Sequence, residues 1–172
     1  MIRHIPKSSC IVMPWKNGGG STAEIARHPQ AEGPFIWRVS IAEVASSGPF
    51  SRFDGYDRHI LMLKGNGMKL QAGAHGTLPL DTPFTPQSFP GEWQIEGILT
   101  NGPVQDFNLM IARDAATGTL RSQKVTAGHA FACPKASTML VHDTAIGDSW
   151  LADEAITAST VGTFIIATIT PR

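Results

Sequence analysis

Glycine and proline, spread evenly along the chain, restrict its folding more than any other feature. There are 17 glycines and 12 prolines among the 172 residues, and few windows of helix length lack one of them. Because proline costs about 3 kcal/mol and glycine about 1 kcal/mol in a helix interior, long helices are disfavoured. Instead, short runs of β-branched or aromatic residues end at Gly, Pro, Asn or Asp roughly every eight to twelve residues. This spacing is typical of sandwiches and barrels, so the sequence predicts an all-β protein.

The predicted strands follow these runs. They are Ser9–Met13, Ala23–Arg27, Phe35–Val44, His59–Leu63, Met68–Gln71, Trp93–Leu99, Val104–Arg113, Leu120–Val125, Thr138–His142 and Thr163–Ile169. The segment Lys64–Met68 predicts a tight hairpin in which Gly and Asn take positive φ. Residues 73–87 hold three prolines and three threonines, and we expect them to connect two sheet-forming halves of one domain, 1–172.

The charge balance argues against two classes of partner. The 14 Lys and Arg residues equal the 14 Asp and Glu residues, so the formal net charge is zero. Nucleic-acid binders and proteins held on anionic membranes carry clustered basic residues, so neither nucleic acid nor a membrane is expected as a partner. No apolar run of about 7–15 residues near the start resembles a signal peptide, which predicts a cytoplasmic protein. The two cysteines, Cys10 and Cys133, are expected to be free thiols.

Local motifs indicate neither a metal site nor a nucleotide site. The closest two of the six histidines are 13 residues apart, so no short His spacing anchors a metal, and no cofactor is expected. The segment Gly18–Ala23 matches a dinucleotide-binding pattern, but Pro29 follows too closely for the helix that such a site requires. The segment is either a flexible turn between strands or, with Lys16 and Asn17, a concavity that binds an anion.

Arg38 lies inside a predicted strand where a charge needs a partner. Alternation along Phe35–Val44 puts Trp37 and Val39 on one face and Arg38 and Ser40 on the other, and both faces are mostly apolar. An unpaired guanidinium is too costly to bury there. Arg38 therefore meets either a protein carboxylate or an anionic ligand.

The loop Gly48–Arg58 combines aromatic and ionisable residues and leads into a predicted buried strand. Its alternating acids and bases form either a solvated surface of ion pairs or a binding site. Arg58, beside Asp57 at the mouth of that strand, is well suited to holding a carboxylate with its two-pronged guanidinium. If they are desolvated, four acids are able to act as acid or base, namely Glu24, Asp54, Asp57 and Asp106.

Several blocks of residues, in order, resemble the HutD/Ves family. The blocks are Met13–Gly20 (MPWKNGGG) with Thr22, Glu24 and Ile25, then Trp37–Ser40 (WRVS), Gly48–Ser51 (GPFS), Phe53, Gly55–Arg58 (GYDR) and Asp106–Met110 (DFNLM). The most specific pair is WKNGGG followed by GYDR. Beyond Arg113 no block of similar specificity occurs.

The resemblance implies a cupin-like β-barrel or jelly roll, built as a bicupin from two fused units. It also implies a role in bacterial histidine utilisation, in which the protein binds a small metabolite such as formylglutamate or urocanate and limits pathway output. The general cupin metal motifs fit poorly: counted back from Gly65, Arg58 stands in the place of the metal-binding Glu. Such a pocket would favour an anion in place of a cation.

We therefore predict a non-catalytic regulator that binds a small anionic metabolite and no metal. Arg58 would hold the carboxylate, with Trp37 and Phe53 as apolar walls. The further ligand-binding residues would be Lys16, Asn17, Arg38, Ser40, Ser51, Asp57 and Asn108.

Two alternatives stay open. One is a metal-independent isomerase or hydrolase of a similar carboxylate that uses Asp57 or Asp54 as its base. The other is a structural or partner-binding protein whose motif residues serve folding alone. The sequence leaves a homodimer open as the assembly.

Overall fold

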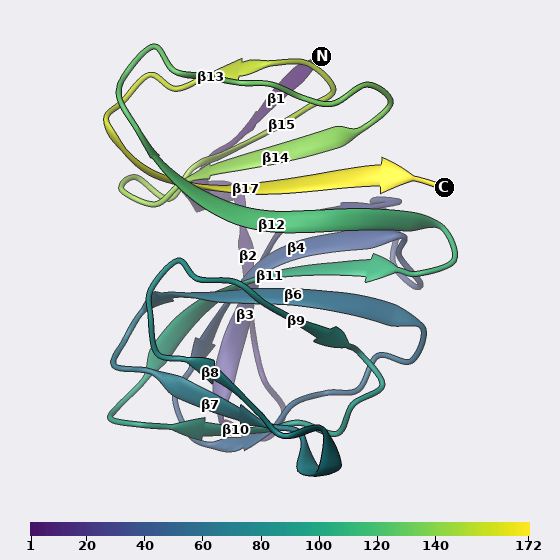
Figure 1. Ribbon diagram of the computed structural model, residues 1–172, viewed down its shortest axis with the longest axis vertical. Helices are drawn as coiled ribbons and strands as arrows, with labels where there is room; N and C mark the ends of the chain where they lie inside the picture. The colour runs from purple at the N-terminus through teal and green to yellow at the C-terminus, as the bar shows by residue number, and fades with distance from the viewer.

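The computed structural model describes residues 1–172, and it is built almost wholly from β-strands (Figure 1). The strands are β1 (Ile2–Ile5), β2 (Ile11–Pro14), β3 (Gly20–His28), β4 (Trp37–Val44), β5 (Gly48–Pro49), β6 (Tyr56–Lys64), β7 (Met68–Gln71), β8 (Thr77–Leu80), β9 (Gln87–Pro90), β10 (Glu96–Leu99), β11 (Val104–Ala112), β12 (Ala116–Val125), β13 (Ala130–Phe131), β14 (Thr138–Asp143), β15 (Ser149–Ala152), β16 (Ile156–Thr157) and β17 (Gly162–Pro171). The only helices are two short 3-10 turns, η1 (Lys7–Ser9) and η2 (Gly73–His75). The prediction of an all-β chain is confirmed.

The strands form four sheets in two stacked units. The lower unit in Figure 1 pairs a six-stranded sheet, in the order β2-β3-β4-β11-β6-β9, with a four-stranded sheet, β5-β10-β7-β8. The upper unit pairs a five-stranded sheet, β1-β15-β14-β17-β12, with the small sheet β13-β16. The six-stranded sheet therefore lies between the rest of its own unit and the upper unit.

Alternation along the central strands assigns side chains to two different environments. Val39, Leu61 and Leu109 point toward the upper unit and share one core cluster with Leu140 and Ile165 of the five-stranded sheet. The neighbouring positions point the other way, into the lower unit. This outcome confirms the two faces predicted for Phe35–Val44, since a strand places successive side chains on opposite faces.

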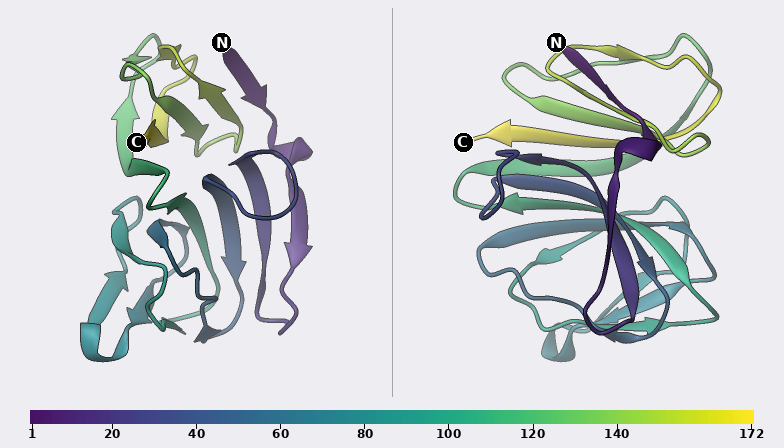
Figure 2. Two further views of the ribbon diagram at one scale, coloured as in Figure 1. Left: turned by 90° about the vertical axis from the view of Figure 1, so that its right-hand side faces the viewer. Right: turned by 180° about the vertical axis from the view of Figure 1, so that it is seen from behind.

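Two segments of chain join the units. The first strand, β1, pairs with β15 in the upper unit, and the chain then descends through η1 to β2 at the edge of the six-stranded sheet (Figure 2, right). The second crossing is the short turn from β11 to β12. The two units share a core above the central sheet. Part of its lower face packs against the four-stranded sheet in a second core, and the rest of that face is left for a site.

Residues 73–87 do not connect the two halves, which corrects that prediction. They contain η2 and β8 within the lower unit, and β8 pairs with β7. Both β8 and β9, which were not predicted as strands, are edge strands and contain proline at Pro79 and Pro90. Proline is tolerated at a sheet edge because its missing N–H leaves no ladder bond unmade.

The segment Lys64–Met68 is a turn between sheets and not a hairpin. It leads from β6 in the six-stranded sheet to β7 in the four-stranded sheet, and these two strands do not pair. Gly65 and Gly67 have positive φ as predicted, whereas Asn66 does not. Gly65 also lies against the backbone of Pro103, where a Cβ atom would come within 2.8 Å of its carbonyl oxygen.

Both cysteines are free and half-buried. None of the helices has the length and apolar character needed to span a bilayer.

Candidate functional site

A cavity of about 480 Å³ opens on the lower face of the six-stranded sheet. Alternate residues of β4 and β11 line it together with one residue of β6, Arg58, and one of β3, Thr22. The end of β2, the β2–β3 turn and the segment Pro49–Phe53 complete the lining. The lining residues are Met13, Pro14, Trp15, Lys16, Asn17, Thr22, Arg38, Ser40, Ala42, Pro49, Phe50, Ser51, Phe53, Arg58, Asp106, Asn108 and Met110. Eight of the ten residues predicted to bind ligand are therefore brought together.

Arg58 lies at the inner wall of this cavity and is 8% exposed. One terminal nitrogen of its guanidinium, Nη1, donates to the carbonyl of Ser51 at 3.2 Å, and Nη2 donates to Oδ1 of Asn108 at 3.4 Å. Its Nε atom is buried without a partner, and no carboxylate lies close enough to form an ion pair with it. Burial lowers the pKa of Arg58 to about 10, although nearby Asp106 opposes that shift. Arg58 is therefore a buried cation without an ion-pair partner among the protein's own carboxylates.

Three phenylalanine rings surround the Arg58 guanidinium. Its central carbon lies 5.5 Å from the ring centre of Phe50, 5.6 Å from that of Phe53 and 5.2 Å from that of Phe89. Aromatic faces attract a cation without neutralising its charge. The rings therefore hold Arg58 in place and leave its positive charge to act on the cavity.

Asp106 and Asn108 are two residues apart on β11, so their side chains lie on the same face of the sheet. The Asn108 amide donates to Oδ1 of Asp106, while Oδ2 of Asp106 is buried without a partner. Asp106 is 1% exposed, and burial raises its pKa from 3.8 to about 7 against the opposing effects of Asn108 and Arg58. The cavity thus contains one carboxyl group that titrates near neutral pH.

Arg38 has a protein partner. Its Nε donates to Oε2 of Glu24 on the neighbouring strand β3 at 2.8 Å, and both side chains are largely buried. Of the two interpretations of Arg38, the protein carboxylate is the one that the structure shows. Arg38 still lines the cavity, but with its charge already compensated.

The glycine run lies in the turn of an antiparallel hairpin between β2 and β3. The Asn17 side chain accepts a hydrogen bond from the Gly19 N–H, and the indole of Trp15 donates to Thr22. The predicted turn between strands is confirmed. A strand and not a helix follows the glycine run, so the segment lacks the helix that a dinucleotide-binding site requires. Lys16 and Asn17 line the cavity from this turn, and their contact with an anion stays a prediction.

Gly20 is needed for close approach of the backbone, which gives a testable contrast with Gly18. A Cβ atom at Gly20 would come within 2.1 Å of the Glu43 carbonyl oxygen, whereas Gly18 has positive φ and open space around it. We expect Gly20→Ala to lower the free energy of unfolding by about 3 kcal/mol, the upper end of the range for overpacking, because β3 and β4 would have to separate. Gly18→Ala should cost no more than about 1–2 kcal/mol, the strain of a left-handed residue. Urea unfolding of both variants checks this, and equal losses would contradict it.

Trp37 and Asp57 lie outside the cavity, which corrects the prediction that they line it. Trp37 points from β4 into the core shared with the upper unit and is 6% exposed. Asp57 precedes Arg58 on β6, so alternation turns its side chain away from the cavity. Its carboxylate instead accepts from Nε of Arg113 at 2.8 Å.

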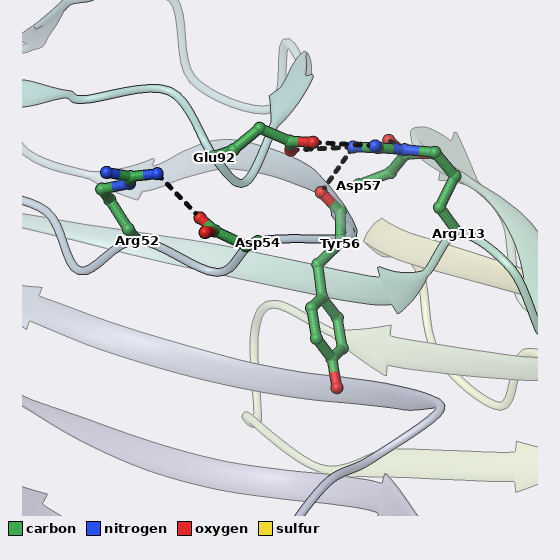
Figure 3. A network of polar contacts seen from close by, with 6 residues as sticks. All are labelled: Arg52, Asp54, Tyr56, Asp57, Glu92 and Arg113. Atoms are coloured by element: carbon green, nitrogen blue, oxygen red, sulfur yellow. Dashed lines mark hydrogen bonds and ion pairs between the residues drawn. The ribbon is translucent and has the colours of Figure 1, made fainter.

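Figure 3 shows the ion pairs formed by charged residues in and near the loop Gly48–Arg58. Arg113 contacts Asp57 and both carboxylate oxygens of Glu92, and it also donates to the Tyr56 carbonyl. Hydrogen bonds from Arg113 lower the pKa of Glu92 to about 2. Arg52 and Asp54 form a separate, exposed pair (Figure 3). The ion-pair interpretation of the loop therefore holds for its other charges, and Arg58 is the exception.

Several apolar and aromatic parts of the site were not predicted. Trp15 and Met13 stand in the MPWKNGGG block, but nothing in their spacing placed them at the rim. Phe50 belongs to the aromatic loop, and the pattern GPF was the only signal for it. Phe89 lies on an edge strand that was not predicted, so its contact with Arg58 had no signal in the sequence.

The donor set around the cavity does not fit a metal ion. The structure contains no group of three or more His, Cys, Asp or Glu side chains placed to hold one. Arg58 and Lys16 line the cavity without an ion-pair partner, Arg38 is paired with Glu24, and Asp106 is the only carboxyl group among the lining residues. Positive side chains repel a cation, so the charges of this cavity suit an anion better than a metal ion.

Comparison with known proteins agrees with the resemblance seen in the sequence. The chain is 48% identical over 102 residues to an uncharacterized 21.2 kDa protein in the hutC 3' region of Pseudomonas putida. It is 39% identical over 111 residues to protein Ves of Citrobacter koseri. These matches cover 58% and 62% of this chain, and they span about half of the relatives' own lengths, 53% and 56%.

Solved structures extend the likeness over the whole chain. HutD from Pseudomonas fluorescens SBW25 is 30% identical with a TM-score of 0.84, and the match covers 100% of both chains. The bacterial pirin YhhW from Escherichia coli, in complex with nickel(II), is 9% identical with a TM-score of 0.64 and 99% of each chain covered, which shows a shared, cupin-like fold alone. The HutD family itself matches residues 7–160. With that span and the ordered motif blocks, the chain belongs to the HutD family.

Proposed function

We propose that the cavity binds the carboxylate of a small metabolite of histidine utilisation, of the formylglutamate or urocanate class, and that this binding serves regulation and not catalysis. The observation that carries the proposal is the state of Arg58. It is a buried cation, framed by three rings and without an ion-pair partner, at the wall of a cavity of about 480 Å³.

The charges around the cavity favour an anionic ligand. Arg38 is paired with Glu24, which leaves Arg58 and Lys16 as the cations without an ion-pair partner among the lining residues. Burying a charge without a partner is unfavourable, so a ligand carboxylate at Arg58 would gain the attraction that the protein does not supply. Ser40 and Asn108, which also line the cavity, offer further hydrogen bonds.

The pathway is proposed from the names of the relatives. One sequence relative is described by its place in the hutC region, and one structural relative is named HutD. These names connect the family with histidine utilisation. We also propose that the two stacked units are the two cupin units of a bicupin.

The residues give the enzyme alternative little support. Asp54 and Asp57, its two candidate bases, lie outside the cavity in ion pairs with Arg52 and Arg113. A base must lie within hydrogen-bond reach of the proton that it abstracts. Asp106 is the one carboxyl group in the cavity, so the enzyme alternative would need it as the base; we propose that it serves binding and not turnover.

A thermal-shift panel tests the proposal. Urocanate, formylglutamate and glutamate should stabilise the protein, because a ligand at 100 times its dissociation constant adds roughly 2.7 kcal/mol to the free energy of unfolding. Neutral sugars serve as uncharged controls. Nucleotides serve as anionic controls, because their charge is on phosphate groups and not on a carboxylate. Stabilisation by sugars or nucleotides, with none by the carboxylates, would contradict the proposal.

A further inference from the structure

We propose that Asp106 is a positioning residue of the carboxylate site, and that it takes up a proton from solvent when a carboxylate binds at Arg58. The inference rests on the proposed function, since it concerns the same cavity. It goes further by naming the residue that sets how strongly the ligand binds at a given pH.

Asp106 acts on Arg58 through the amide of Asn108. An amide has one donating and one accepting end, and Asp106 accepts from the donating end. The accepting end, Oδ1 of Asn108, is thereby turned toward Nη2 of Arg58 at 3.4 Å. Asp106 thus fixes which way the amide points and, through it, the position of the guanidinium.

The environment of the Asp106 carboxyl group favours its protonated form, and one of its oxygens is free to hold the proton. Asp106 is 1% exposed, its Oδ2 has no hydrogen-bond partner, and it forms no ion pair. The charged groups that face it or lie near it are Arg58 on β6, Arg38 and Glu43 on β4, Glu24 on β3, and Lys16 in the β2–β3 turn. Of these, Arg58 is the cation whose charge stabilises the ionised form.

A ligand carboxylate at Arg58 competes for that charge. Two carboxylates that share one cation in a partly enclosed cavity repel each other, and one of them then holds a proton. The proton comes from solvent and forms an O–H bond at Asp106, and no other bond changes. The pKa of Asp106 is already raised to about 7 by burial, whereas Arg58, with a pKa of about 10, keeps its charge across the neutral range.

The pH dependence of binding tests the inference on the wild-type protein. The probe is whichever of urocanate and formylglutamate stabilises the protein more, and its affinity is measured by calorimetry from pH 6 to 9 in buffers of different ionisation enthalpy. Below about pH 7 Asp106 is protonated before binding, so affinity should change little. Above pH 7 binding needs a proton, so affinity should fall by up to about tenfold per pH unit, with proton uptake approaching one per ligand.

Two variants assign the proton to Asp106. Asp106→Asn keeps the shape and the hydrogen bond from Asn108 but is always neutral, so its affinity should lose the decline above pH 7. Asp54→Asn, an exposed residue outside the cavity, is the matched control and should keep the wild-type profile. Because the same ligand is used throughout, any titration of the ligand itself appears in all three profiles.

A measurement without ligand supports or overturns the same assignment. The folded-state pKa of Asp106 lies above its ordinary value of 3.8, so its contribution to stability is present below about pH 4 and is lost as pH rises through 7. The free energy of unfolding of Asp106→Asn, relative to wild type, should therefore rise from pH 4 to pH 7. Parallel curves would overturn the inference.

The outcomes separate this inference from the proposed function. Tight binding of the carboxylate with a flat profile, or with a decline that survives in Asp106→Asn, overturns the role of Asp106 and leaves the carboxylate site standing. An absence of carboxylate binding at every pH overturns both.

Discussion

Replacing Arg58 with alanine is expected to weaken binding of urocanate or formylglutamate by about 2–5 kcal/mol. The substitution removes a charge-assisted contact at a buried guanidinium, and truncating one partner of a buried charge pair has effects of this size. Calorimetric titration of the two proteins at one pH measures the difference. Arg58→Lys should recover only part of the loss, because an ammonium lacks the planar fork of the guanidinium.

The matched control is Arg52→Ala. Arg52 lies in the same loop region but forms an exposed pair with Asp54, so its removal should leave affinity unchanged and alter stability by less than about 1 kcal/mol. The contrary result for Arg58→Ala is a large loss of stability without ligand, with unchanged affinity in the folded fraction. That result would mean that Arg58 holds the loop together and touches no ligand.

Replacing Phe107 with alanine is expected to lower the free energy of unfolding by about 3–5 kcal/mol. Phe107 is fully buried on β11, in the core between the two units, and its ring lies 5.4 Å from that of His142 on β14. Losing a buried aromatic side chain removes its transfer free energy and leaves a cavity. Denaturant unfolding, followed by fluorescence and by circular dichroism, measures the loss.

Val161→Ala is the control for this second prediction. Val161 is 65% exposed, so the change should lie within about 0.5 kcal/mol of wild type. A loss for Phe107→Ala below about 1 kcal/mol, or two separate transitions in the wild-type protein, would contradict the single core that the two units share.

Much of the fold could be predicted because local patterns decided it. The strand Met68–Gln71 was placed to the residue, and the two faces of Phe35–Val44 followed from alternation alone. Edge strands were the main failure. Proline in β8 and β9 argues against a strand when only the sequence is known. It is tolerated because both strands lie at a sheet edge, and that position depends on which strands pair in the fold.

The sequence was enough to identify charged residues of the site, but not to tell which of them form ion pairs with each other. Arg58 was identified by its place at the mouth of a buried strand, but Asp57 beside it in sequence pairs with Arg113, 56 residues away. Strand alternation separates neighbours in sequence, so adjacency is weak grounds for an ion pair. Asp106 was a candidate acid only, because its burial depends on how the two sheets of the lower unit pack.

A structure of the protein with urocanate or formylglutamate bound tests the carboxylate site most directly. We expect a ligand carboxylate in the cavity with oxygens at roughly 2.7–2.9 Å from the Arg58 guanidinium nitrogens, the usual range for charge-assisted bonds. Arg38 should keep its contact with Glu24 in that complex. A ligand bound elsewhere, or bound in this cavity with an uncharged group toward Arg58, would contradict the proposed role of Arg58.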